Sequence, residues 1–364
     1  MKKLTVFFMA AVLMVAITQA AEAQQFKWKL QSTQPAGTPH IELLNKLSNN
    51  IEKISAGRLK IEVLPAGAIV DAFHILDGVD KGVIEMGQWW AHYAIGKSPA
   101  AGLFTSPLGG AATGLDQFNQ VAWYLRGGGR ELYVELYQKT LRADVMPFFF
   151  APDGPECLGW FKKPITTVAE YKKLRMRMSS GLPSDALREM GGIPVSVAAQ
   201  EIIPSAERGV LDAVEWSNPA TDIKLGLYDV FKFYSLQGLH QAIDISDIVI
   251  NGKAWRSLPP DIQAAIEVAM TASMLDSMVF FATENGKAIE TLTKEKGVTL
   301  FDAPPDYAPA FIAASKKVLS KFEKEDPFFK KVLDSQRAFA KSVVPYSKES
   351  AKLSQLIAGA ADEK

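Results

Sequence analysis

The sequence predicts a two-lobed α/β protein in which two sheets are flanked by helices, followed by a long C-terminal helix. Strand-like and helix-like segments alternate from Phe26 to Gly87, and a second alternating series runs from Met146 to Trp216. A Lys-rich helical pattern follows Pro304-Pro305. A mature chain of about 340 residues is long enough for two cores, so each series is expected to build its own lobe.

The N-terminus has the composition of a secretory signal peptide. Met1-Lys2-Lys3 precedes a short apolar run from Leu4 to Ile17, and Ala21-Glu22-Ala23 follows it. We expect residues 1–23 to be removed by cleavage near Ala23 and the mature protein to be soluble and exported. The run is shorter than the roughly 18 residues of a membrane-spanning helix, and no later stretch is expected to be long and apolar enough to span a membrane.

Charge and cysteine content narrow the classes of partner. Removal of Lys2, Lys3 and Glu22 changes 40 basic and 40 acidic residues to 38 and 39, a net charge near −1. This balance gives no support for nucleic acid or an anionic membrane as a partner. Cys157 is the single cysteine, so an internal disulfide is excluded. The histidines form no zinc-like cluster in the sequence; they are His40, His74, His92 and His240.

The first series should form a largely parallel sheet. Strands are expected at Phe26–Leu30, Leu59–Val63 and Ile84–Gly87. An amphipathic helix should begin at Thr38-Pro39 and end near Ala56-Gly57. In such sheets, ligands lie beyond the carboxyl ends of the strands.

The second series begins at the apolar run Met146–Phe150 and contains several short segments. We expect strands at Trp160-Phe161, Leu174–Met178, Val195–Val197 and Val214–Trp216. A helix is expected at Pro183–Met190. Ile248–Ile250 should return to the first sheet, and Pro259-Pro260 should begin a long helix that reaches about Lys287. The expected lobes are residues 24–148 with about 238–280, and residues 149–237 with about 281–325.

Residues 326–364 are expected to form a C-terminal helical extension. Its apolar residues include Phe328, Phe329, Val332, Leu333 and Phe339, set among many lysines. Two interpretations remain open: a solvated helix packed on its own domain, or a dimerisation element that needs a partner for its apolar face.

Two predicted strand ends, some forty residues apart in the sequence, carry charged residues. Arg177 ends one strand, with Arg175 on the same face, and Glu215-Trp216 ends another. An arginine fork matches a carboxylate in two parallel hydrogen bonds, whereas a nearby glutamate repels that carboxylate unless a cation lies between them. The pair predicts a pocket for a small organic acid bound with a metal ion. The structural alternatives are solvated arginines, a lysine-paired Glu215 and a core Trp216.

Two further segments are weaker candidates. Gly154-Pro155-Glu156 is a tight loop that ends in a carboxylate, and Trp89, Trp90 and Tyr93 follow the third strand. These aromatic residues either belong to a core or wall a small ligand. The Gly-rich segment Arg126–Arg130 lacks the spacing of a dinucleotide or phosphate-binding loop.

Together, these segments resemble the substrate-binding proteins of TRAP transporters, above all the branch that binds α-keto and α-hydroxy acids. The resemblance covers nearly the whole mature chain. It rests on Met86–Pro99, Leu103-Phe104, Pro107–Gly109, Ser55–Ile61, Leu174–Arg177 and Gly209–Trp216.

The resemblance implies a periplasmic binding protein-like fold of two lobes with two mixed sheets, which closes on its ligand and passes it to a sodium-driven TRAP membrane transporter. It also implies dimers formed through a long terminal helix. Arg177 matches the residue that grips the ligand carboxylate. A bridging cation is held by the side chains matching Glu156 and Glu215 and by the carbonyl matching Trp216. Further ligand contacts fall on Asn218 and Tyr93, with Trp90 and Trp216 beside them.

One position departs from the family pattern, because Glu156 stands where glutamine is usual. Arg177 contributes one positive charge, while Glu156, Glu215 and a monocarboxylate contribute three negative charges, a net −2; glutamine would leave −1. An unbalanced buried charge costs several kcal/mol, so calcium is predicted in preference to sodium. Alternatively, Glu156 is protonated or binds an ammonium or hydroxyl group of the ligand.

The predicted function is therefore capture of a small 2-oxo or 2-hydroxy monocarboxylic acid by hinge closure, without a reaction. One alternative is an exported hydrolase that uses Glu156 and Glu215 as acid and base. No nucleophile elbow, triad order or metal-hydrolase helix supports it in the sequence. A second alternative is a ligand sensor of the same fold.

Overall fold

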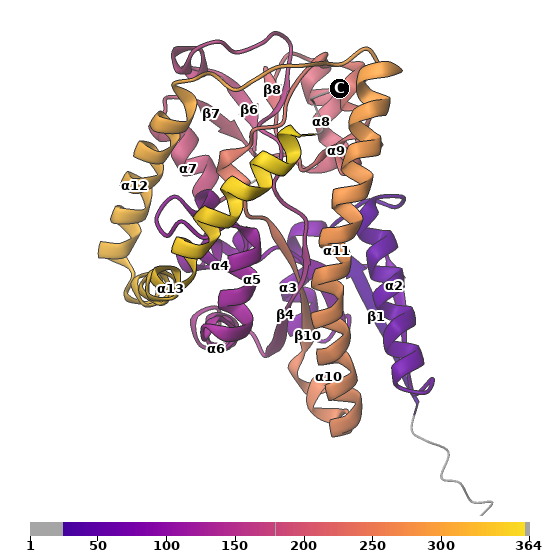
Figure 1. The fold of residues 1–364 in the computed structure, drawn as a ribbon. Helices are drawn as coiled ribbons and strands as arrows, with labels where there is room; N and C mark the ends of the chain where they lie inside the picture. Colours follow the sequence, from indigo (N-terminus) through magenta and orange to yellow (C-terminus); the bar gives the residue numbers. More distant parts are fainter. Residues whose placement is uncertain (1–24, 179, 361–364) are drawn as a thin grey trace, which may run out of the picture.

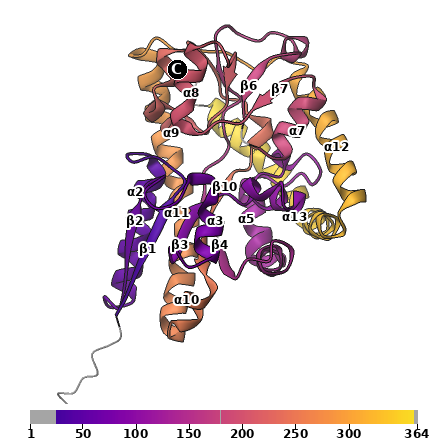
Figure 2. The same ribbon diagram turned by 180° about the vertical axis from the view of Figure 1, so that it is seen from behind.

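The computed structural model describes residues 25–178 and 180–360. Two sheets lie in separate lobes, and helices cover both of them (Figures 1 and 2). The two mixed sheets and the two-lobed fold predicted from the sequence are confirmed. The predicted signal peptide, residues 1–23, lies outside the described residues.

The first lobe contains a five-stranded mixed sheet of order β2-β1-β3-β10-β4. Strand β1 pairs in parallel with β2 and β3, whereas β10 runs antiparallel to both β3 and β4. The segment Ile248–Ile250 thus returns to the first sheet, as its sequence predicted. The strand bounds are β1 Phe26–Ser32, β2 Leu59–Leu64, β3 Met86–Trp89, β4 Val145–Pro152 and β10 Ile245–Asn251.

The second lobe contains a six-stranded mixed sheet of order β11-β9-β5-β8-β6-β7. Strand β6 lies between β7 and β8 and is parallel to both, which aligns Arg177 with Val214. The ends of β6 and β8 are therefore adjacent. The strand bounds are β5 Gly159–Phe161, β6 Arg175–Arg177, β7 Ile193–Val195, β8 Ala213–Val214, β9 Phe233–Ser235 and β11 Thr299–Leu300.

The helices follow the apolar patterns of the sequence. Helix α2 begins with Pro39 in its first turn and buries Leu43, Leu44, Leu47 and Ile51 on one face. The helix bounds are α2 Pro39–Ile54, α3 Ile75–Asp80, α4 Gly102–Thr105, α5 Gln117–Arg126, α6 Gly129–Glu135, α7 Leu182–Glu189, α8 Ala199–Glu207, α9 Pro219–Leu225, α10 Gly252–Ser257, α11 Pro260–Lys294, α12 Tyr307–Glu325 and α13 Pro327–Gly359.

Helix α11 runs along the side of both lobes (Figure 1). It contacts α2 and β4 of the first lobe and α9 of the second. Among the described residues, this helix alone is long and apolar enough to cross a membrane, by length and composition only. The expectation that no later stretch reaches this length and hydropathy was therefore wrong. Part of the apolar surface of α11 is used in packing on its own chain, because Ile262, Ile266 and Phe281 are buried.

Two expected lobe boundaries fall inside continuous elements. Strand β4 pairs with β10 from Val145 to Pro152, so residues 149–152 lie with the first sheet and not with the second lobe. The run Phe148–Phe150 is buried on both faces and shows no alternation, and the sequence therefore does not indicate its sheet. Helix α11 likewise continues without interruption through residues 280 and 281.

The C-terminal pattern forms two helices. Helix α12 packs on α7 of the second lobe, and α13 contacts α4, α5 and α6 of the first lobe. Phe329, Val332 and Leu333 are buried in the first half of α13. Residues 348–360, at its end, are exposed throughout. The domain interpretation thus accounts for the helix as far as Ser347, whose hydroxyl accepts a hydrogen bond from Asn119. It does not account for the exposed residues 348–360.

Candidate functional site

The candidate site is a small cavity lined by residues of both lobes. In the second lobe, Arg177 is the last residue of β6, and Glu215, Trp216 and Ser217 follow β8. In the first lobe, Trp90, His92 and Tyr93 follow β3. The remaining lining residues are Gln34, Glu156, Gln241 and Asp244. The cavity measures about 20 Å³. That is little more than the room one water molecule needs, so the site is closed in this structure.

Arg177 and Glu215 meet in this cavity. The Nη1 group of Arg177 donates to the Glu215 carbonyl at 2.7 Å and to its Oε2 at 3.2 Å. Glu215 N–H in turn donates to the Arg177 carbonyl at 3.0 Å. Both side chains are almost fully buried. A buried acid and base in contact compensate each other's charge, and removal of either would leave the other uncompensated.

Trp216 supports the guanidinium of Arg177. The guanidinium carbon lies 4.5 Å from the centre of the indole ring, a distance typical of cation–π contact. Arg175, two residues earlier, is exposed and binds Asp212 through Nε at 2.8 Å and Nη2 at 2.7 Å. Of the two arginines on this strand face, Arg177 is the one that enters the cavity.

Glu156 lies on the segment that crosses from β4 to β5. Its N–H donates to the Gln241 carbonyl at 3.0 Å, and the next N–H, of Cys157, donates to the Ser217 carbonyl at 2.8 Å. The Gly154–Pro155 peptide bond that precedes it is cis. These backbone bonds hold the loop that bears Glu156 against the loops that bear Glu215 and His240.

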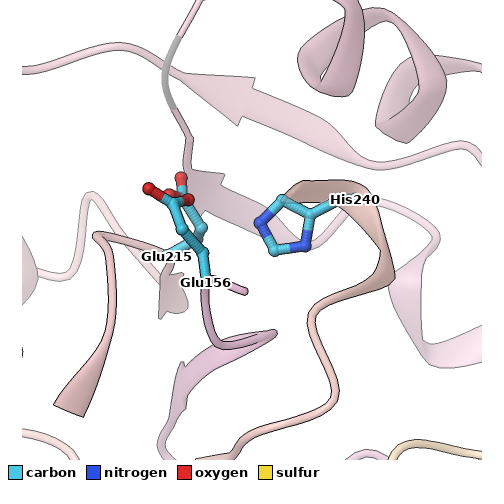
Figure 3. A group of neighbouring side chains, drawn as sticks. All are labelled: Glu156, Glu215 and His240. Carbon is cyan, nitrogen blue, oxygen red and sulfur yellow. The ribbon is translucent and has the colours of Figure 1, made fainter. Parts of the chain in front are cut away.

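The three side chains form one group. Potential ligand atoms of Glu156, Glu215 and His240 all lie within 4.8 Å of one another, and Figure 3 shows the imidazole facing the two carboxyl groups. Burial, followed by the negative charges of Asp244 and Glu215, raises the pKa of Glu156 well above its usual value. The Oε2 atom of Glu156 has no hydrogen-bond partner among the described residues. A cation placed here would relieve both the repulsion and the missing contact.

The first lobe contributes aromatic walls. Tyr93 lies in the short 3-10 helix η2, Ala91–Ala94, and contacts the ring of Trp90 at 5.9 Å between centres. Trp90 Nε1 donates to Asp244 Oδ2 at 2.8 Å. His92 binds the Thr105 hydroxyl through Nδ1 at 3.1 Å, and burial lowers its pKa to about 3. This side of the cavity therefore carries no positive charge at neutral pH.

A buried acid pair lies behind Trp90. The carboxyl groups of Asp153 and Asp244 interact directly, and burial raises the pKa of Asp153 to about 7 and that of Asp244 well above its usual value. Each carboxyl group therefore favours its protonated form more than it would in water. His40 Nε2 lies 2.8 Å from Asp153, and burial lowers the pKa of His40 to about 4. This His–Asp contact is therefore not a pair of full charges at neutral pH.

The structure brings together most of the residues chosen from the sequence. Arg177, Glu156, Glu215, Trp216, Trp90 and Tyr93 all line the cavity. Asn218 does not: its Nδ2 donates to the Asp153 carbonyl at 3.0 Å, and its Oδ1 accepts from Thr221 N–H at 3.2 Å. Asn218 is the N-cap of α9 and fixes the loop there; its predicted ligand contact stays a prediction.

Sequence reasoning missed His240, Gln241 and Asp244. They lie on the segment that returns from β9 to β10, between the two lobes. The available signal was a polar segment directly before a strand expected to return to the first sheet, since chain crossings between lobes border the cleft. Asp153, on the other crossing, was recognised only as part of the loop before Glu156.

Several buried polar atoms around the cavity have no hydrogen-bond partner within residues 25–178 and 180–360. They are Glu156 Oε2, Arg177 Nε, Trp216 Nε1, Ser217 Oγ and both ring nitrogens of His240. Buried polar groups are normally satisfied, and a cluster of exceptions indicates a site for a ligand or an ion. The donor set offers carboxylate oxygens for a cation and the Arg177 N–H for an anion.

Comparison with known proteins gives a consistent result. The DctP family model, bacterial extracellular solute-binding protein, family 7, matches residues 30–326. A monocarboxylate 2-oxoacid-binding periplasmic protein of Nostoc sp. is 28% identical over 322 residues, which cover 88% of this chain and 86% of the relative.

Solved structures with the same fold contain cations and small acids. A TRAP transporter solute-binding protein of Bordetella bronchiseptica superposes with a TM-score of 0.87 at 25% identity, covering 94% of this chain and 100% of that chain; it is a mixed-occupancy dimer with copurified calcium and picolinate in one site. A protein of Pseudoalteromonas atlantica with sodium and pyruvate superposes with a TM-score of 0.84 at 27% identity. A protein of Colwellia psychrerythraea with calcium and pyruvate has the same TM-score and identity. For both, the match covers 91% of this chain and 99% of the other.

Proposed function

The chain belongs to the bacterial extracellular solute-binding proteins of family 7, and from this premise we propose that it is the periplasmic receptor of a TRAP-type transporter for a small 2-oxo or 2-hydroxy monocarboxylic acid. The membership confirms the resemblance found in the sequence. The observation that carries the proposal is the meeting of Arg177 and Glu215 in one buried cavity bordered by both lobes. Its partners are the acid and the TRAP membrane subunits that receive it.

Arg177 would hold the ligand carboxylate. Its Nη1 is bonded to Glu215, and its Nε–H has no acceptor within the described parts of the chain. The Nε edge of a guanidinium offers two parallel N–H groups to a carboxylate. Because Arg177 is the one arginine or lysine among the lining residues, a single carboxylate is favoured over a dicarboxylate.

The cavity favours a small ligand with an additional oxygen. Trp90, Tyr93 and Trp216 supply flat apolar walls, while Gln34, Ser217 and Gln241 supply polar groups. At about 20 Å³, the closed cavity must widen to admit even a short acid, and rotation of the lobes about the crossing segments would supply the room. The Nostoc relative, which binds 2-oxo monocarboxylates, supports this ligand class.

A bridging cation would be held by Glu156, Glu215 and the Trp216 carbonyl, and when bound it would neutralise the carboxylates and accept a ligand oxygen. The residues fit because two buried carboxyl groups lie together and Glu156 Oε2 lacks a partner in the described chain. A divalent ion balances the net charge of −2 that Arg177, Glu156, Glu215 and a monocarboxylate produce, whereas sodium leaves −1. We therefore favour calcium over sodium; related structures contain one or the other.

A second copy of the chain is the proposed partner of the exposed end of α13. Tyr346, Leu353, Leu356 and Ile357 are between 59% and 79% exposed there. An apolar stripe of this kind normally packs against another surface. The dimer reported for the Bordetella bronchiseptica relative supports a copy of this chain as the occupant.

The test is ligand binding by chelator-treated, dialysed protein, measured calorimetrically with pyruvate in calcium, in sodium and in chelator alone. We expect binding in calcium, weaker binding in sodium and the weakest in chelator. Equal pyruvate binding in all three buffers would refute the proposed bridging cation. If neither pyruvate nor lactate bound in any buffer, the assigned ligand class would be wrong. Native mass spectrometry of undialysed protein would give the mass of any copurified acid and ion. Turnover of ester or glycoside probes by pure protein would favour the hydrolase alternative.

A further inference from the structure

His240 is placed beside the carboxyl groups by the segment that returns to the first lobe. It lies in the short 3-10 helix η8, Leu239–Gln241. Gly238, directly before this helix, packs so closely on the Glu156 backbone that a Cβ there would lie 2.1 Å from the Glu156 carbonyl oxygen. Real Cβ contacts do not reach that distance, so any other residue at 238 would push η8 away from Glu156. The glycine permits the approach of His240 to the acids.

The imidazole of His240 is buried and makes no hydrogen bond to the described residues. It is 1% exposed, and neither ring nitrogen has a hydrogen-bond partner within the described chain. An imidazole ring can offer one nitrogen lone pair to a cation. A buried unsatisfied polar group costs about 1–3 kcal/mol, which a ligand to that nitrogen would offset.

We propose that His240 is a third side-chain ligand of the cation bound by Glu156 and Glu215, and that the site consequently prefers Zn²⁺ or Mn²⁺ to Ca²⁺. This inference rests on the proposed function only because both use the cation site at Glu156 and Glu215. The charge count favoured a divalent ion over sodium, and the nitrogen donor now favours a transition ion or zinc over calcium. The nitrogen donor of His240 is the observation that favours Zn²⁺ or Mn²⁺ over Ca²⁺.

The donor chemistry decides between these ions. Ca²⁺ takes six to eight oxygen ligands and gains little from imidazole. Imidazole nitrogen suits first-row transition ions and zinc, and the affinity of mixed nitrogen and oxygen sites for Zn²⁺ generally exceeds that for Mn²⁺. Two carboxylates and one imidazole thus favour the order Zn²⁺, then Mn²⁺, then Ca²⁺.

The geometry requires only a small adjustment. The donor atoms of the three residues are at most 4.8 Å apart. Donors at about 2.1 Å from one tetrahedral ion are about 3.4 Å apart, so a pair of donors must approach by up to about 1.4 Å. Rotation of the glutamate side chains suffices for this change, because Glu156 Oε2 makes no competing hydrogen bond with any described residue.

The experiment compares wild type with His240→Gln, which keeps an oxygen donor but removes the nitrogen. The control is His74→Gln, since His74 is an exposed imidazole on the first lobe. Metal-free protein is titrated with Zn²⁺, Mn²⁺ and Ca²⁺, each as the metal alone. We expect wild type and His74→Gln to bind Mn²⁺ at least tenfold more tightly than Ca²⁺. His240→Gln should lose at least tenfold in Mn²⁺ affinity while its Ca²⁺ affinity changes less than threefold.

Pulsed EPR of the Mn²⁺-loaded wild type gives a readout that does not depend on the variant's folding. A ¹⁴N coupling from a directly bound imidazole is expected in wild type and in His74→Gln, and its absence from wild type would overturn the proposal. So would Ca²⁺ affinity equal to or above that for Mn²⁺. In either case, pyruvate binding that still depends on calcium would leave the receptor function intact. If pyruvate binding did not depend on any cation, the proposed bridging site itself would be refuted.

Discussion

The exchange Arg177→Lys tests the anion-binding role most directly. Lysine keeps the positive charge that compensates buried Glu215, so the variant avoids an uncompensated buried acid. It loses the planar fork, which presents two parallel N–H groups to a carboxylate. It also loses the flat guanidinium that lies 4.5 Å from the centre of the Trp216 ring. The substitution therefore tests the geometry of the guanidinium group while the positive charge at position 177 is kept.

The expected loss follows from these contacts. A hydrogen bond to a charged group contributes about 1.5–3 kcal/mol, and a cation–π contact about 0.5–2 kcal/mol. Lysine retains one bond to the ligand and part of the ring contact, which leaves a loss of about 2–4 kcal/mol. Since about 1.4 kcal/mol corresponds to a tenfold change, the dissociation constant for pyruvate should rise roughly 30- to 700-fold.

The assay is calorimetric titration with pyruvate at a fixed, saturating cation concentration, with thermal unfolding measured in parallel. Arg175→Lys is the matched control, because Arg175 lies two residues away on the same strand and is exposed and paired with Asp212. We expect less than a threefold effect from this control. If Arg177→Lys binds within fivefold of wild type, or if Arg175→Lys weakens binding equally, then the assignment of the carboxylate to Arg177 is refuted.

Two further outcomes are expected. Burial raises the pKa of Asp247 to about 7 despite its hydrogen bonds to Tyr133, Tyr137 and Ala91; its stabilisation is therefore greatest at low pH and is lost as the pH rises through 7. Between pH 5 and pH 8, the free energy of unfolding of wild type should fall by roughly 3 kcal/mol relative to that of Asp247→Asn. A pH-independent difference between the two proteins would contradict this. Light scattering after gel filtration should report a dimer for wild type and a monomer when Leu356 and Ile357 are both changed to Glu, while Lys352→Glu stays dimeric; a monomeric wild type would disprove the proposed role of α13.

Local patterns were enough to predict several elements. The first apolar turns of α2 and the alternation in β2 appear in the sequence because one face of each is buried and the other faces solvent. Arg177 and Glu215 were recognisable because a charge at the end of a short apolar strand contradicts simple burial. Their contact also required β6 and β8 to be neighbours, which the resemblance to a family supplied and periodicity did not.

The remaining errors concern contacts between segments far apart in the sequence. Phe148–Phe150 is buried on both faces, so nothing local indicated that β4 pairs with β10. His240 and Asp244 reach the cavity only because their segment is bonded to the one bearing Glu156, about 85 residues earlier.

The bond between Arg177 and Glu215 has a consequence for how the two ligands would depend on each other. In this structure, Glu215 occupies an N–H group of Arg177 while it also lies beside Glu156. If Glu215 turns its carboxylate toward a cation, it releases part of the guanidinium for the acid and no longer repels it. The acid in turn returns a negative charge beside the two glutamates and strengthens the field that holds the ion. Each ligand therefore improves the site for the other, and linkage requires the two gains in affinity to be equal. The placement of Glu156 and His240 on the two segments that cross between the lobes extends this coupling to closure, because drawing their donor atoms together also draws the crossing segments together.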